Sequence, residues 1–188
     1  MFAKRLVLLA ACSLAGMAQA ADVRPIVKAG IDTGGDTMVT ANFIGGGSET
    51  VKANEGVFVG GGMSWVNDTK DIEVEVAITY KVAVINADNG DIDWTRLPID
   101  ALVFYRTTNF RFGGGLTYHI NPKLEGSGVS NNINVNFDDA LGVILQADWR
   151  ITQKINLGLR YTAVEYKADG FSGSAKTDGV GLAFSMRF

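Results

Sequence analysis

Charged side chains of both signs recur at alternate positions in several parts of the chain. Side chains two residues apart share one face of a β-strand, so Glu73 and Glu75, or Asp148 and Arg150, would line the same face. The charges assigned to this face are Lys28, Asp32, Glu73, Glu75, Lys81, Asp100, Arg106, Arg111, Asp148, Arg150, Arg160 and Arg187. Unpaired charges withdrawn from water are costly, so acids and bases that share an interior are expected to pair. The pattern predicts either a polar network that fills an interior or a gated polar path through it.

The single histidine, His119, is the side chain most open to a catalytic interpretation. Nucleophilic catalysis needs a base beside its nucleophile and an acid that orients the base. Ser127 and Ser130 lie in the loop that follows, and Glu125 is nearby, so they are the candidate partners. We expect instead a structural or loop-anchoring His119 that faces inward near the outer end of a strand.

Two further motifs resemble ligand sites only in part. Residues 88–93 are rich in oxygen ligands but lack the spaced terminal Glu of a full calcium loop, so a solvated turn is expected. The triple glycines that begin at Gly45, Gly60 and Gly113 are not followed by the Lys-Ser/Thr of a phosphate loop. The sequence thus predicts no catalytic residue, no metal and no cofactor.

The first twenty residues are typical of a cleaved export signal. A basic pair at 4–5 precedes a short apolar stretch at 6–11, and Ala-Gln-Ala stands at 18–20. An uncleaved anchor and a lipoprotein lipidated at Cys12 are the alternatives. Cleavage after residue 20 would remove the only cysteine, which leaves no disulfide framework. The formal net charge of −3 argues against a nucleic-acid partner, which would require a basic face.

The charged positions belong to segments in which apolar and polar residues alternate with period two. Residues 72–84 are the clearest case, because every second residue from Ile72 to Val84 is a large apolar or aromatic one. Clusters of turn-forming residues separate the segments. The eight expected strands span 24–34, 56–67, 72–84, 95–107, 109–121, 139–152, 154–168 and 178–188. An additional hairpin is expected within 35–55, from strands at 37–43 and 49–53.

The connections and the hydrophobicity define the fold class. No run of about 20 apolar residues exists, so no transmembrane helix is expected. The connections near 67–70, 107–109 and 152–154 are short and the others are long, the outer-membrane arrangement with long loops outside the cell. The sequence predicts an all-β protein, an eight-stranded antiparallel up-and-down transmembrane β-barrel that spans 21–188.

Residue size indicates which face of the strands meets lipid. Large aromatic residues share the apolar face, whereas glycines share the charged face. Because eight strands enclose little space, the small residues fit the interior better. An aromatic girdle is expected beside the short turns, formed by Trp65, Tyr105, Phe110, Trp149 and Phe188. A soluble secreted barrel or sandwich is the alternative, since alternation alone does not orient the faces.

The last ten residues, 179–188, alternate apolar residues and end in an aromatic one. This segment resembles the C-terminal signal that the outer-membrane assembly machinery reads, with Phe184, Met186 and Phe188 as its apolar positions. The chain as a whole resembles the small eight-stranded outer-membrane barrels of Gram-negative bacteria, the group of the OmpA, OmpX and OmpW types. The resemblance implies an outer-membrane location. It also implies contacts with membrane lipid, lipopolysaccharide and the assembly machinery, and leaves the oligomeric state open.

Three roles are compatible with this resemblance. The first is a structural or interaction barrel with a plugged interior and outer loops that contact lipopolysaccharide or partners. The second is a narrow channel for small hydrophobic molecules, as the OmpW resemblance implies. The third is a lipid A-modifying enzyme, but His119 is followed by Ile120-Asn121 rather than by the His-x-Ser pattern of the lipid A deacylases. The sequence favours the first role.

Overall fold

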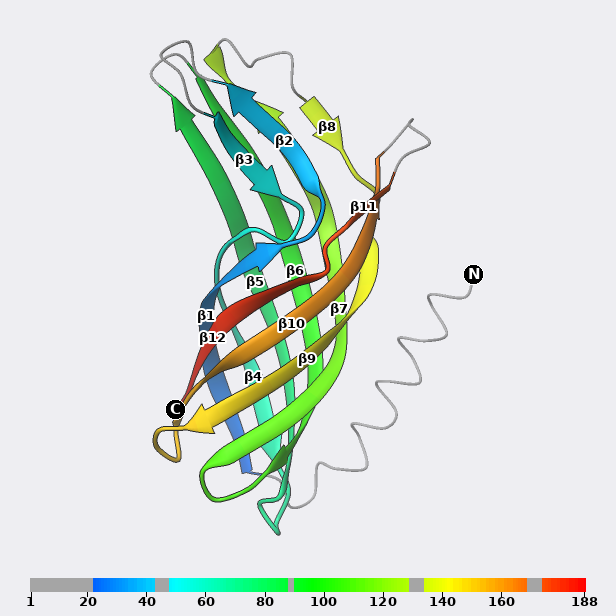
Figure 1. Ribbon diagram of the computed structural model, residues 1–188. Coiled ribbons are helices and arrows are strands. Elements are labelled where there is room, and N and C mark those ends of the chain that lie inside the picture. Colours follow the sequence, from blue (N-terminus) through cyan, green and yellow to red (C-terminus); the bar gives the residue numbers. More distant parts are fainter. Residues whose placement is uncertain (1–21, 43–47, 88–89, 129–133, 169–173) are drawn as a thin grey trace, which may run out of the picture.

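The strands close into one barrel (Figure 1). The computed structural model describes residues 22–42, 48–87, 90–128, 134–168 and 174–188, so the expected signal peptide lies outside the described residues. The barrel strands are β1 (Asp22–Gly34), β4 (Gly56–Val66), β5 (Ile72–Ala87), β6 (Gly90–Arg106), β7 (Phe110–Gly126), β9 (Ala140–Arg150), β10 (Ile155–Lys167) and β12 (Gly179–Arg187). Each pairs antiparallel with the next, and β12 pairs with β1 to close the ring. The predicted eight-stranded antiparallel barrel is confirmed.

The expected hairpin is also present, and two very short strands accompany it. Strand β2 (Thr37–Asn42) pairs with β3 (Ser48–Lys52), as the sequence predicted. Strands β8 (Asn134–Asn136) and β11 (Ser174–Lys176) pair antiparallel with the ends of β7 and β10 and were not predicted. Three residues hold too little alternation to be recognised in a sequence.

Side chains of Asn and Thr hold the three short turns. Asn67 accepts a hydrogen bond from the backbone N–H of Ile72 at 3.0 Å, and Lys70 adopts a φ of 60° in the same turn. The hydroxyl groups of Thr107 and Thr152 hydrogen-bond backbone groups within their own turns. Such local bonds are the usual reason that these residue types favour turns. In the first turn, hydrogen bonds from Thr69 and Asn67 lower the pKa of Asp71.

The barrel wall is much taller on one side. Strands β5, β6 and β7 have 16, 17 and 17 residues, whereas β9 has 11 and β12 has 9. At about 3.3 Å per residue, the difference amounts to roughly 20 Å. Figure 1 shows the tall strands rising past β10 and β12, with the β2–β3 hairpin beside their upper part. We call the end of the barrel toward which the tall strands rise the loop end. The opposite end, which carries the short turns, is the turn end.

The predicted end of a strand at Asn121 was wrong. Strand β7 continues to Gly126 through an irregularity, where the register with β6 shifts between Thr95 and Leu97. Asn121 takes a φ of 48°, and its backbone N–H donates to the Asp139 carboxylate at 2.9 Å. A bulge absorbs an extra residue and bends the strand without ending it, so the Asn-Pro pair at 121–122 does not act as a turn.

The apolar face of the strands points away from the lumen. Leu159 is 66% exposed, Leu145 is 61% exposed, and similar side chains from every barrel strand are exposed around the outer wall. A soluble protein rarely exposes an apolar surface of this extent, which overturns the soluble alternative. No helix among the described residues is long and apolar enough to cross a membrane.

The prediction that large rings stay outside the barrel was only partly right. Phe58, Phe104, Trp94 and Tyr166 point inward and are at most 4% exposed. A side chain at Gly113 would collide with the ring of Phe104. Glycine therefore makes room for an aromatic ring on the neighbouring strand, so a glycine-rich face does not exclude rings.

Candidate functional site

The turn-end half of the lumen is filled by an ion-pair network centred on Arg111. Its guanidinium donates to the carboxylates of Asp148, at 2.6 Å, and of Glu75, and to the hydroxyl of Ser185 at 2.9 Å. Its face lies 4.1 Å from the ring centre of Phe104, a cation–π distance. Lys28 donates to the second oxygen of Glu75 at 3.2 Å. Arg111 thus joins acids on β5 and β9 and a hydroxyl on β12 across the lumen.

Two further pairs fill the middle of the lumen. Arg160 bonds both oxygens of Asp100, at 2.8 and 3.4 Å, and Thr117 donates to the same carboxylate at 2.7 Å. Lys81 donates to Asp32 at 2.5 Å and to the side chain of Asn54 at 3.1 Å. All four charged residues are at most 4% exposed. The expectation that inward acids and bases pair across the lumen agrees with this geometry.

Eleven of the twelve predicted interior charges are buried, and the exception is Arg150. Arg150 is only half-buried at the turn end, where it donates to the backbone carbonyls of Thr107 and Thr108. A long side chain on the last residue of a strand can reach the rim instead of the lumen. The sequence reading missed Arg96, which is 2% exposed and lies 4.7 Å from the ring centre of Trp94. Its even-numbered spacing from Asp100 and Arg106 could have identified it.

The loop-end half of the lumen is closed by an apolar cluster. Its buried members are Val51, Ala83, Ile85, Ile92, Trp94, Leu124, Ala140, Val164 and Tyr166. The hairpin contributes Val51 and the partly buried Met38 and Val39, so it packs onto the inner face of the tall wall. The indole N–H of Trp94 donates to the carbonyl of Ala53 at 3.0 Å, which fixes the chain that follows the hairpin. The hairpin therefore covers the ion-pair layer.

His119 lies inside the barrel beside Tyr166. Its Nδ1 is hydrogen-bonded to the Tyr166 hydroxyl, and its Nε2 has no partner among the described residues. Ser127 instead accepts a hydrogen bond from the backbone of Asp91, and Glu125 pairs with Lys123 at 2.8 Å. Ser130 lies outside the described residues. The structure therefore does not bring His119 together with Ser127 or Glu125.

The oxygen-rich motif at 88–93 is only partly visible, because 88–89 lie outside the described residues. Asp91 and Asp93 stand on β6, where they pair with Asn86 and Val84 of β5. In the described part of the chain, no group of three His, Cys, Asp or Glu side chains could hold a metal ion.

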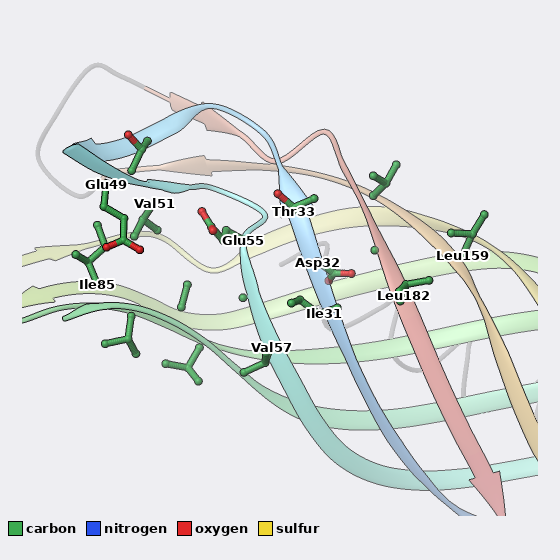
Figure 2. Close-up of a pocket in the computed structure, with 17 residues that line it drawn as sticks. Ile31, Asp32, Thr33, Glu49, Val51, Glu55, Val57, Ile85, Leu159 and Leu182 are labelled. Atoms are coloured by element: carbon green, nitrogen blue, oxygen red, sulfur yellow. The ribbon is translucent and has the colours of Figure 1, made fainter. Parts of the chain in front are cut away.

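A lateral pocket of about 670 Å³ opens in the outer wall near the loop end (Figure 2). Pairing between β4 and β5 ends at Val57 and Val82, and beyond that point β3 pairs only with β2 among the described strands. The pocket lies between β3 and β5, and Glu49, Val51 and Ile85 lie at one end of it in Figure 2. Because Val51 and Ile85 belong to the apolar cluster, the pocket ends on that cluster.

The predicted girdle and assembly positions lie on the outer wall. Tyr105, Phe110, Trp149 and Phe188 are 47–57% exposed, and Trp65 is half-buried. Phe184 and Met186 alternate with the inward Ser185 and Arg187 along β12. Their roles in the membrane interface and in assembly stay predictions.

The described geometry combines a closed barrel, a lipid-facing apolar wall and a charged interior. The family model for the outer membrane protein beta-barrel domain matches residues 6–188. The chain belongs to this family. Its barrel is therefore an outer-membrane barrel, and the predicted location is confirmed.

Solved outer-membrane barrels have the same fold as this family member. Neisserial surface protein A is 14% identical, with a TM-score of 0.51 over 90% of this chain and 100% of that chain. The attachment invasion locus protein Ail of Yersinia pestis is 8% identical, with a TM-score of 0.56 over 90% and 99%. Outer membrane protein H of P. aeruginosa is 13% identical, with a TM-score of 0.52 over 88% and 99%. At these identities the likeness concerns the fold alone, and no curated protein matches the chain.

Proposed function

We propose that the protein is a sealed outer-membrane barrel that acts through its loop end, as a structural or interaction protein, and not through its lumen. The observation that carries the proposal is the filled interior. The layer centred on Arg111 and the pair of Arg160 and Asp100 occupy the lumen, and the cluster around Trp94 lies above them. An eight-stranded barrel has just enough room for its own side chains.

The tall wall supports an interaction role. Strands β5, β6 and β7 rise well beyond the rest of the barrel, and the hairpin packs against their inner face. A solvent channel needs no such extension. In outer-membrane barrels the long loops lie outside the cell, so the wall would hold its loops above the membrane, where lipopolysaccharide or other partners are available.

The purified protein should show no steady ion conductance in planar bilayers. The buried pairs leave ions no hydrated path, and separating a buried pair costs several kcal/mol. A large porin in the same bilayers is the positive control. Stable, open channels in the unmodified protein would contradict the proposal.

The lateral pocket favours a second candidate, a binding site for small apolar molecules that enter from the membrane. Ile31, Val57 and Leu182 belong to the lipid-facing wall, and the pocket continues from them to the apolar cluster. An apolar compound or an acyl chain dissolved in the outer leaflet could enter such a space without crossing water.

Uptake of an apolar fluorescent compound distinguishes the two candidates. Cells that express the protein should take up the compound no faster than cells with empty vector, because the pocket ends on buried side chains. Val57→Trp fills the pocket, whereas Val103→Trp changes an equally exposed position outside it. Faster uptake that is lost in Val57→Trp and kept in Val103→Trp would establish the second candidate.

Deletion of Phe188 should reduce the amount of protein in the outer membrane at high expression. Phe188 ends the outward apolar row of β12, and its backbone N–H donates to the carbonyl of Pro25 at 3.1 Å. The level is measured in outer-membrane fractions, with Phe188→Tyr as the control that keeps an aromatic ring. Unchanged membrane levels after the deletion would count against an assembly signal at this position.

A further inference from the structure

The turn end of the lumen opens into a small basic pocket, which we call the basic mouth. Its volume is about 280 Å³. The bases that line it are Arg24, Lys70, Arg106, Arg150, Lys154 and Arg187. Among the described residues of this lining, Asp22 is the one acidic side chain, and it already pairs with Arg24 at 2.6 Å and with Arg187 at 3.1 Å. The bases are therefore in clear excess over this acid.

The nearest buried acid, Glu73, cannot balance this excess. It is 1% exposed and accepts a hydrogen bond from the Ser64 hydroxyl at 2.5 Å. The nitrogens of Arg106, Arg111 and Arg187 lie 3.1, 3.3 and 3.8 Å from its oxygens. One carboxylate is thus shared by three guanidinium groups. The other acids near Arg111 belong to the deeper layer of the network.

Arg106 has donors that no described residue uses. Its Nε lies 3.1 Å from a Glu73 oxygen but has no hydrogen-bond partner within the described part of the chain, and the residue is only 8% exposed. The Nε of Arg187 likewise has no hydrogen-bond partner there, and that residue is 6% exposed. A guanidinium carries five N–H donors, and buried donors normally have partners. Two nearly buried arginines at one opening therefore leave donors available to a ligand.

We propose that the basic mouth binds a phosphate group from the periplasmic side, with Arg106 and Arg187 as the inner donors and Lys154 near the entrance. The planar fork of arginine matches the oxygens of phosphate and can bind them in pairs. The volume lies just below the range of sites for drug-sized ligands, which fits a single anionic group. Its source is either free phosphate or the headgroup of an anionic phospholipid.

The test follows the arginine side-chain N–H signals of the ¹⁵N-labelled, folded protein in zwitterionic micelles by NMR. Inorganic phosphate is titrated against sodium chloride at equal ionic strength. The Nε–H signals of Arg106 and Arg187 should shift with saturation in phosphate only, whereas that of Arg160, deep in the lumen, should stay fixed. Shifts that grow linearly and equally in both salts would overturn the proposal, because they would report screening alone.

Substitutions localise the effect. Arg106→Lys keeps the charge but loses the fork, and should weaken phosphate binding by about tenfold, the usual scale for losing a charged hydrogen bond. Lys154→Gln changes an exposed side chain outside the ion-pair network, and should weaken binding less without affecting the fold. Lys167→Gln, at the loop end of β10, is the control that should change nothing. Binding that is equal in all three variants would place the phosphate elsewhere and overturn the proposal.

The source is identified by repeating the measurement in lipid bilayers without free phosphate. If bilayers that contain phosphatidylglycerol shift the Arg106 signal and bilayers of pure phosphatidylcholine do not, the ligand is an anionic headgroup. If neither does, while free phosphate still does, the mouth binds a soluble periplasmic anion.

Discussion

Replacement of Arg111 by methionine should lower the free energy of unfolding by about 3–5 kcal/mol, the usual cost of removing one partner of a buried ion pair. Arg111 is 0% exposed, and it bonds Glu75, Asp148 and Ser185. Methionine fills much of the same space but leaves Glu75 and Asp148 without their shared cation. The loss is measured by urea unfolding of the protein in lipid vesicles. Water entering the lumen should also produce brief conductance events that the unmodified protein lacks.

Two variants make this result specific. Arg24→Ala removes an arginine whose pair with Asp22 is half exposed, at 49% and 50%, and should change stability by no more than about 1 kcal/mol. Adding Glu75→Gln to Arg111→Met should recover part of the loss, because one unpaired charge disappears. If Arg111→Met were no more destabilising than Arg24→Ala, the network would not be what seals the barrel.

Most of the barrel could be predicted from the sequence because each strand carries its own signal. The alternation in 72–84 fixes both the strand and its inward face, and every barrel strand shows a version of it. The extension of β7 could not be predicted, since it depends on Asp139, a residue from another strand end, bonding the backbone of Asn121. The local sequence contains only the Asn-Pro pair at 121–122, which is typical of a turn.

The site was predictable in composition and not in arrangement. The alternation of inward and outward side chains along each strand identifies Glu75 and Arg111 as inward residues. Their contact, however, depends on the register and tilt of strands far apart in sequence. The inward rings were missed for a similar reason. Phe104 has room because Gly113 faces it on the next strand, a pairing that no single segment reveals.

The seal at the loop end depends on one ring that the sequence reading did not select. Trp94 is 0% exposed and meets Tyr166 and Phe137 edge-on, with ring centres 5.3 and 5.2 Å apart. Its indole N–H also bonds Ala53, next to the end of β3. The hairpin has no strand pairing to the barrel among the described residues. Beyond the hydrogen bonds of Asp36 with Lys176 at its base, such side-chain contacts hold it in place.

Trp94→Ala should therefore lower the free energy of unfolding by about 3–5 kcal/mol, the usual range for a buried Trp truncated to Ala, and should loosen the hairpin first. Amide hydrogen exchange at Val39 and Val51 should accelerate far more than exchange at positions near the turn end. The hairpin would open at a lower free-energy cost, because the indole contacts that oppose its opening are absent from the variant. Trp149→Ala is the matched control, since that ring is 55% exposed on the lipid face. It should leave hairpin exchange unchanged. If the two variants gave the same exchange pattern, the hairpin would be held by its own strand pairing or by the loops, and Trp94 would be only one apolar side chain among several in the cluster.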